Sequence, residues 1–133
     1  MKYFLDTNII IYALKDTYPA IKEHFLKVPA SSIAIPSPVL AEIEYGARKS
    51  FDYEKTIATY RQFTNTFELV SFAKKATHAF GQIRAELEKQ GKTIGANDLM
   101  IAAIVLAENG ILVTHNTREF ERITQLRIED WTC

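Results

Sequence analysis

Four short apolar runs, separated by longer segments with helical spacing, most constrain how this chain can fold. The runs lie at residues 2–5, 33–35, 68–72 and 111–114. The first and the last are continuously apolar at their centres, which is typical of strands buried in a parallel sheet. Parallel strands need a crossover connection, usually a helix, so strands that alternate with helices indicate a parallel α/β sandwich. The length of 133 residues fits one domain spanning 1–133.

The segments between these runs have apolar residues spaced as in helices. We expect helices at 9–15, 18–28, 38–49, 51–67, 73–90 and 96–107, a short helix within 115–120, and an edge strand or cap at 126–131. Thr7 or Asn8 can cap the first helix, and Ser37 the third. Gly91 is expected to end the fifth helix, and Gly110 to take the left-handed position after the sixth.

Composition restricts the class of protein. The 16 basic and 16 acidic residues balance, with a pI near 6.8, which argues against a generic nucleic-acid binder with a basic excess. Cys133 is the only cysteine, so no intrachain disulfide can form, and His24, His78 and His115 lack the spacing of a zinc site. No apolar run approaches the roughly 20 residues of a membrane span. Asp6 comes too early for a signal peptide, so we expect a cytoplasmic protein.

Carboxylates and one amide follow the predicted strands or lie on helices beside them. Asp6 ends the first strand, Glu42 lies in the helix after the second, Asp98 lies in the first turn of the apolar helix 96–107, and Asn116 and Glu119 follow the fourth strand. The carboxyl ends of parallel strands share one edge, so these side chains can meet in one crevice. Clustered carboxylates repel one another unless a divalent cation offsets their charge. The pattern therefore predicts a divalent-metal site.

Each of these residues also has a structural interpretation when it is taken alone. Asp6 could cap a helix, Asp98 is favoured by the helix dipole, and Glu42 could be a solvated side chain. Asn116 could be a turn residue and Glu119 a surface residue. The metal-site hypothesis therefore depends on the set.

With these motifs in view, the chain resembles the PIN-domain ribonucleases, and among them the VapC toxins of bacterial VapBC toxin–antitoxin modules. The resemblance covers essentially the whole chain, and several ordered motifs at family spacing are more specific than any one of them. The matching motifs are Phe4–Ile9, Ala41–Ala47, Gln82–Gly91, Ile94–Ala102, Val113–Phe120 and Glu129–Trp131.

The resemblance implies a PIN-like three-layer sandwich with a central, mostly parallel sheet of four to five strands flanked by helices. It also implies an endoribonuclease toxin that depends on Mg²⁺ or Mn²⁺, leaves 5′-phosphate and 3′-hydroxyl ends, and inhibits translation and growth. The Asn-Thr-Arg-Glu-Phe and Glu-Asp-Trp segments look like those of VapC proteins that cut initiator tRNA in the anticodon loop. Ribosomal RNA or mRNA is the alternative substrate.

The same resemblance carries metal-site and catalytic roles onto Asp6, Glu42 and Asp98. Many PIN domains have Asp where this chain has Asn116, so either Asn116 or the acidic Glu119 fills the fourth position. This departure leaves the number of ions, one or two, open.

Supporting and substrate-binding roles complete the expected site. Thr7 and Thr114 resemble the family hydroxyls that support the acids, and Asn8 is expected to orient the loop. The expected RNA contacts come from Arg84, Arg118 and His115, and other basic side chains that could guide a phosphate backbone are Arg48, Lys49, Lys74, Lys75 and Arg122. Charged helix faces are more often only solvated.

The resemblance further implies a homodimer and a VapB-type antitoxin that places a basic side chain at the acids and reads operator DNA. A receiver domain is a competing hypothesis, but the third strand ends in Ser71-Phe72-Ala73 without a phosphoacceptor Asp. An Asp-x-Asp phosphatase would need an acid where Asn8 stands. A catalytically silent module that only binds an antitoxin is the remaining alternative.

Overall fold

A five-stranded sheet organises the structure, a computed structural model that describes all residues from 1 to 133. Its strands are β1 (Tyr3–Leu5), β2 (Ile33–Pro36), β3 (Glu68–Val70), β4 (Ile111–Val113) and β5 (Arg127–Glu129). Their order is β3-β2-β1-β4-β5, and every neighbouring pair is parallel. A strand lies at each of the four apolar runs, and residues 126–131 supply the expected edge strand. The sheet is wholly parallel, where the resemblance implied a mostly parallel one.

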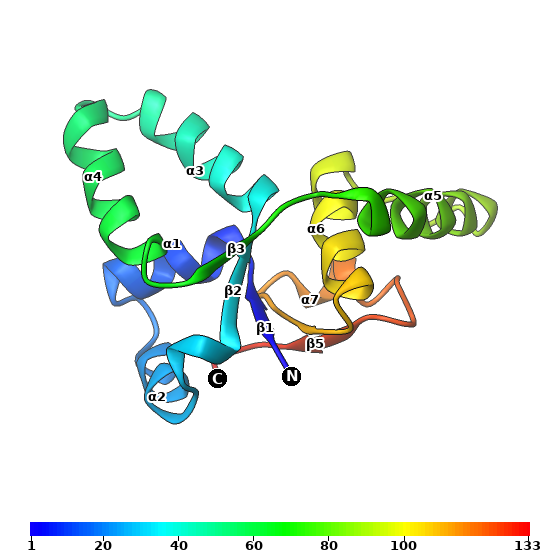
Figure 1. Cartoon of the computed structure of the whole chain (residues 1–133), viewed down its shortest axis with the longest axis horizontal. Helices are drawn as coiled ribbons and strands as arrows, with labels where there is room; N and C mark the ends of the chain where they lie inside the picture. Colours follow the sequence, from blue (N-terminus) through cyan, green and yellow to red (C-terminus); the bar gives the residue numbers. More distant parts are fainter.

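Seven α-helices connect and cover these strands. They are α1 (Thr7–Lys15), α2 (Pro19–Lys27), α3 (Ser37–Arg48), α4 (Tyr53–Thr64), α5 (Lys74–Lys89), α6 (Ala96–Ala107) and α7 (Thr117–Phe120). In Figure 1, α1 to α4 gather on one side of the strands and α5 to α7 on the other. The expected α/β architecture, with a sheet flanked by helices, is confirmed. None of these helices has the length and apolarity needed to cross a membrane.

Helix α6 is apolar around its whole circumference, and the fold buries it accordingly. Leu99 and every residue from Ile101 to Val105 are buried. The helix packs against α5, α3, β2 and β4. This packing on several sides holds the first turn of α6, which carries Asp98, against the sheet.

The strand order reverses at β1, which pairs with β2 on one side and β4 on the other. Leu5 at the end of β1 lies opposite Val113 at the end of β4. The backbone N–H of Asp6 donates to the Val113 carbonyl at 2.9 Å, which extends the pairing by one residue. Asp6 and Thr114 therefore leave the sheet side by side, at the point where parallel α/β sheets place their ligands.

Two of the helix caps differ from the sequence expectation. The N-cap of α1 is Asp6, whose Oδ1 accepts the Thr7 N–H at 2.9 Å, so Thr7 and Asn8 are inside the helix. Ser37 is the first residue of α3, and its hydroxyl accepts the Phe72 N–H at 3.2 Å. The predictions for these caps were wrong because Asp6 caps α1 one residue earlier, and because the hydroxyls of Thr7 and Ser37 bind the distant Glu42 and Phe72 instead.

The end of α6 also differs from the expectation. Asn109, with φ of 54°, takes the left-handed conformation that was predicted for Gly110. Gly110 is required for a different reason, since a Cβ there would lie 2.5 Å from the Phe4 ring and 3.0 Å from the Lys2 carbonyl oxygen. Gly91, with φ of 66°, follows α5 as predicted.

Candidate metal centre and active site

Three carboxylates from three separate elements meet at the carboxyl edge of the sheet. Asp6 follows β1, Glu42 lies on α3, and Asp98 lies in the first turn of α6. One carboxylate oxygen from each residue lies within 4.8 Å of the other two. Asp6 is buried, while Glu42 and Asp98 are half-buried, so the group has one enclosed end and one open end.

Two buried threonine hydroxyls hold these acids in place. Thr114 Oγ1 donates to Asp6 Oδ2 at 2.8 Å and accepts the Asn116 N–H at 3.0 Å. Thr7 Oγ1 donates to Glu42 Oε1 at 2.9 Å. The hydroxyls expected to support the acids therefore contact them directly. Asn8 is exposed, and its side chain forms no hydrogen bond.

The electrostatics of the three acids disfavour three negative charges. Burial raises the pKa of Asp6, although hydrogen bonds from Thr114 and Thr7 partly oppose this. Burial likewise raises the pKa of Glu42. Burial and the charges of Asp6, Glu119 and Glu42 together raise the pKa of Asp98 to about 7. A divalent cation would relieve the repulsion that contributes to these shifts.

The chemistry of the donor set fits a hard cation. All three residues of the cluster offer carboxylate oxygens, and neither a histidine nor a cysteine belongs to it. Carboxylate oxygens are the ligands that Mg²⁺ and Mn²⁺ prefer, whereas Zn²⁺ sites are typically built from His and Cys. The acidic cluster is therefore consistent with a metal site of the PIN type.

Glu119 and Asn116 lie beside the cluster and bind each other. Asn116 Nδ2 donates to Glu119 Oε2 at 2.9 Å, and the Gly95 N–H donates to Glu119 Oε1 at 3.3 Å. Glu119 also shares a hydrogen bond with Asp98, which contributes to the raised pKa of that residue. The side chain that reaches Asp98 is thus Glu119, while the amide of Asn116 orients Glu119.

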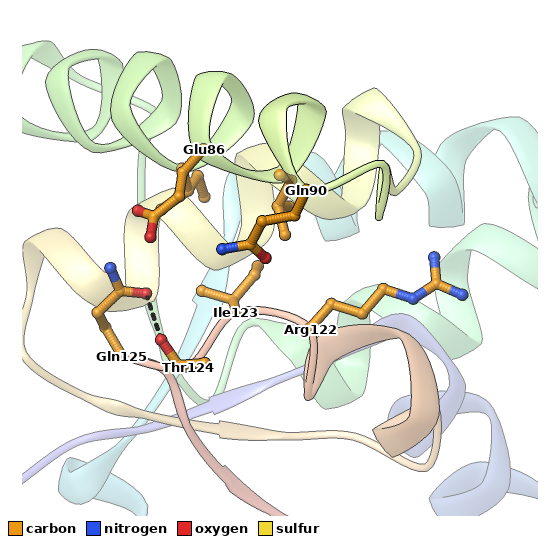
Figure 2. Close-up of a pocket in the computed structure, with 8 residues that line it drawn as sticks. Glu86, Gln90, Arg122, Ile123, Thr124 and Gln125 are labelled. Atoms are coloured by element: carbon orange, nitrogen blue, oxygen red, sulfur yellow. Dashed lines mark hydrogen bonds between the residues drawn. The ribbon is translucent and has the colours of Figure 1, made fainter.

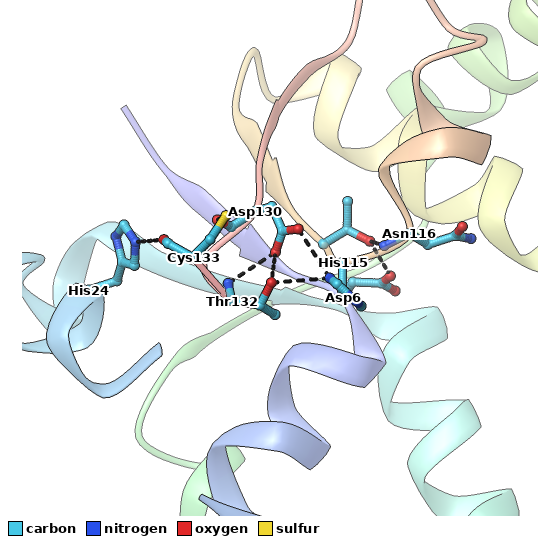
Figure 3. A network of polar contacts seen from close by, with 8 residues as sticks. Asp6, His24, His115, Asn116, Asp130, Thr132 and Cys133 are labelled. Carbon is cyan, nitrogen blue, oxygen red and sulfur yellow. Dashed lines mark hydrogen bonds and ion pairs between the residues drawn. The ribbon is translucent and has the colours of Figure 1, made fainter. Parts of the chain in front are cut away.

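His115 belongs to a separate polar network beside Asp6, shown in Figure 3. Its Nδ1 lies 3.1 Å from Asp130 Oδ2 and 3.1 Å from Thr132 Oγ1. Partial burial would raise the pKa of Asp130, but hydrogen bonds from Thr132 and His115 outweigh it and lower the pKa. The His115 ring also lies beside those of Tyr12 and Tyr18, at centroid distances of 6.0 and 5.6 Å.

The two expected RNA-binding arginines lie in different surroundings. Arg84 on α5 pairs with Glu88 at 3.4 Å and lines a hollow between α5 and the start of α6. Arg118 on α7 is exposed and lies next to Glu119 in the chain. The structure therefore brings Arg118, but not Arg84, to the element that carries Glu119.

Three contributors to the site were not assigned from the sequence. Asn97 lies close to Glu42 and partly opposes the rise of its pKa, Gly95 contacts Glu119 through its backbone, and Asp130 holds His115. Asn97 and Gly95 lie within three residues of Asp98 in the Ile94–Ala102 motif, so proximity to a predicted metal ligand was an available signal. No local signal links residues 115 and 130, because only the pairing of β4 with β5 brings them together.

Comparison with known proteins agrees with this geometry, since the PIN domain family matches residues 3–126. The fold and the acidic cluster thus define a PIN domain. The chain is 43% identical over 133 residues to ribonuclease VapC2 of Rickettsia felis, with 98% of both chains covered. It is 41% identical to the tRNA(fMet)-specific endonuclease VapC of Shigella flexneri, with 99% of both covered. The chain belongs to the VapC ribonucleases of the VapBC toxin–antitoxin systems.

Solved structures show the same relationship. The structure of VapBC2 from Rickettsia felis, bound to a DNA fragment from its promoter, matches with a TM-score of 0.90 and 41% identity. The match covers 98% of this chain and 99% of that one. The PIN-like fold expected from the sequence motifs is therefore confirmed over the whole chain.

Proposed function

We propose that this chain is an endoribonuclease toxin that uses Mg²⁺ or Mn²⁺ to cut initiator tRNA in its anticodon loop. The cut leaves 5′-phosphate and 3′-hydroxyl ends and thereby inhibits translation and growth. The observation that carries the proposal is the meeting of Asp6, Glu42 and Asp98 within 4.8 Å. The choice of substrate is supported by the tRNA(fMet) specificity in the name of the Shigella flexneri relative.

In this proposal the three acids hold the metal ion, and nearby side chains fix their geometry. Such an ion, when bound, supplies Lewis-acid polarisation of a phosphodiester and acidifies a water molecule. Thr114 orients Asp6, and Thr7 orients Glu42, through the hydrogen bonds described above.

Glu119 takes the fourth acidic position in this proposal. It acts on the cluster through Asp98, with which it shares a hydrogen bond, and so adds to the negative charge that the metal ion would offset. Asn116 positions Glu119 through its amide and is not itself a ligand. His115 lies at the edge of the site, held by Asp130, where it can contact substrate RNA.

The proposed partners follow from the charge of the chain and from its relatives. Because basic and acidic residues balance at 16 each, we infer that this chain does not itself bind operator DNA through a general positive surface. A VapB-type antitoxin binds the toxin, neutralises the acids with a basic side chain, and reads the operator. The promoter-bound VapBC2 complex of Rickettsia felis supports this division of roles. The toxin is a homodimer within that assembly.

The test is incubation of the purified protein with total tRNA, in Mg²⁺ or in EDTA, followed by mapping of the RNA ends. We expect cleavage of initiator tRNA in Mg²⁺ only, and its loss in Asp98→Asn. Glu54→Gln is a matched control because Glu54 lies in the first turn of α4 and belongs to no acidic cluster. Cleavage that persists in EDTA or in Asp98→Asn contradicts the metal site. Cleavage of ribosomal RNA alone contradicts the tRNA substrate, and a lack of any cleavage indicates a silent module.

A further inference from the structure

An open hollow between the loop that follows α5 and the end of the chain segment around α7 is lined only by polar residues and glycine. Its volume is about 520 Å³, and its lining contains three cations and a single carboxylate. The lining residues are Gly91, Lys92, Thr93, Arg118, Glu121 and Arg122. A local excess of two positive charges is notable in a chain whose formal net charge is zero.

Two of the three cations are free to bind an anion. Lys92 and Arg118 are exposed, and neither side chain forms an ion pair or a hydrogen bond within the protein. Arg122 donates from Nη1 to the Thr93 carbonyl at 2.8 Å, which fixes the loop before α6 against the end of α7. Figure 2 shows the Arg122 guanidinium pointing away from Glu86 and Gln90, so neither side chain forms an ion pair or a hydrogen bond with it.

The hollow borders the acids through two short connections. Arg118 and Glu119 are neighbours in α7, and Glu119 shares a hydrogen bond with Asp98. On the other side, the loop that contains Lys92 reaches Gly95, whose N–H donates to Glu119 at 3.3 Å. These connections place the hollow next to the residues on either side of Glu119, the carboxylate that adjoins Asp98.

We propose that Lys92, Arg118 and Arg122 form a phosphate-binding subsite for a phosphodiester that flanks the one to be cut. This inference rests on the proposed ribonuclease function. The acids repel a polyanion, so cations beside them are needed to hold the RNA backbone in place. Such contacts position the strand and do not read its sequence. Arg84 is not part of this subsite, because it pairs with Glu88 and lines another hollow.

The test measures binding of a fluorescently labelled RNA stem-loop by anisotropy, in EDTA so that no cleavage occurs, over a series of KCl concentrations. Arg118→Gln and Lys92→Gln should each raise the Kd about twofold to fivefold, as expected for one solvent-exposed charge contact. Each should also flatten the plot of log K against log salt by about 0.7, the slope of one phosphate contact on a single strand.

Two further variants separate this subsite from general effects of charge and folding. Glu121→Gln removes the only carboxylate that lines the hollow, so it should lower the Kd. Lys55→Gln removes one positive charge from the exposed face of α4 and should change neither the Kd nor the slope. A purely structural role for Lys92 and Arg118 would not alter the salt slope.

The outcomes for the subsite and for the nuclease are distinct. An unchanged Kd and slope in both Arg118→Gln and Lys92→Gln would overturn the subsite, and so would an equal effect of Lys55→Gln. If the expected shifts occur but the unaltered protein cuts no RNA in Mg²⁺, the subsite stands and the proposed nuclease function fails. Absence of RNA binding by the unaltered protein contradicts the subsite directly.

Discussion

Replacing Asp98 with Asn should stabilise the metal-free protein at neutral and alkaline pH, although it removes a proposed metal ligand. Burial, and then the charges of Asp6, Glu119 and Glu42, raise the Asp98 pKa from 3.8 to about 7. Between these two values the folded protein keeps a proton that the unfolded chain has released. The free energy of unfolding therefore falls as the pH rises from 4 to 7, and the loss is complete above pH 7.

The size of this effect follows from the shift after two corrections. A shift of about three units corresponds to about 4 kcal/mol at 1.36 kcal/mol per unit. Because the Asp98 carboxyl is only half-buried, solvent screens it, and we reduce this figure to about 2 kcal/mol. Asn also loses the favourable interaction of a first-turn carboxylate with the helix dipole, about 0.5 kcal/mol. The expected gain for Asp98→Asn is about 1–2 kcal/mol at pH 8 and a fraction of that at pH 4.5.

The measurement is urea unfolding in EDTA at both pH values, followed by circular dichroism. Glu54→Gln is the control, since Glu54 also lies in the first turn of a helix, α4, but belongs to no acidic cluster, and it should show no gain. Adding Mg²⁺ should then stabilise the unaltered protein more than Asp98→Asn, because a ligand that binds only the folded state adds to stability. The reasoning is refuted if Asp98→Asn is less stable at pH 8, or if its gain is the same at both pH values.

Two other substitutions test the packing around the site and the sheet. Thr114→Val removes a fully buried hydroxyl that donates to Asp6 and accepts from Asn116, so it should lower the free energy of unfolding by about 2–3 kcal/mol. Thr114→Ser keeps the hydroxyl and should retain most of the stability of the unaltered protein. Equal urea midpoints for the Val and Ser variants would contradict this account. Gly110→Ala should cost about 1–3 kcal/mol, because the new Cβ would meet the Phe4 ring at 2.5 Å, and an unchanged thermal midpoint would show that the ring can move freely.

Local patterns in the sequence determined most of the elements of this fold. The apolar runs became strands and the helically spaced segments became helices, because the periodicity of burial is a short-range property of the chain. The central position of α6 followed from its apolar character on all sides. The PIN-like motifs indicated Asp6, Glu42 and Asp98, and the structure brings these three residues together.

The strand order and the helix caps depended on tertiary contacts. Leu69 belongs to an apolar run, yet it is 50% exposed because β3 is an edge strand. Ser37, predicted as a helix cap, accepts the Phe72 N–H instead. Asn109 takes the left-handed conformation that was predicted for Gly110. These outcomes depend on which distant groups compete for the same hydrogen bonds, and a local pattern does not contain that information.

The sequence by itself thus determined the parallel α/β class and the presence of acids near strand ends. Only the tertiary structure decided that Asp6, Glu42 and Asp98 meet, and that Glu119 is the side chain that reaches Asp98. The physical reason is distance along the chain. Side-chain preferences and periodicity act between near neighbours, whereas hydrogen bonds and charge pairing at this site join residues far apart in sequence, which meet only when the sheet and α6 have packed.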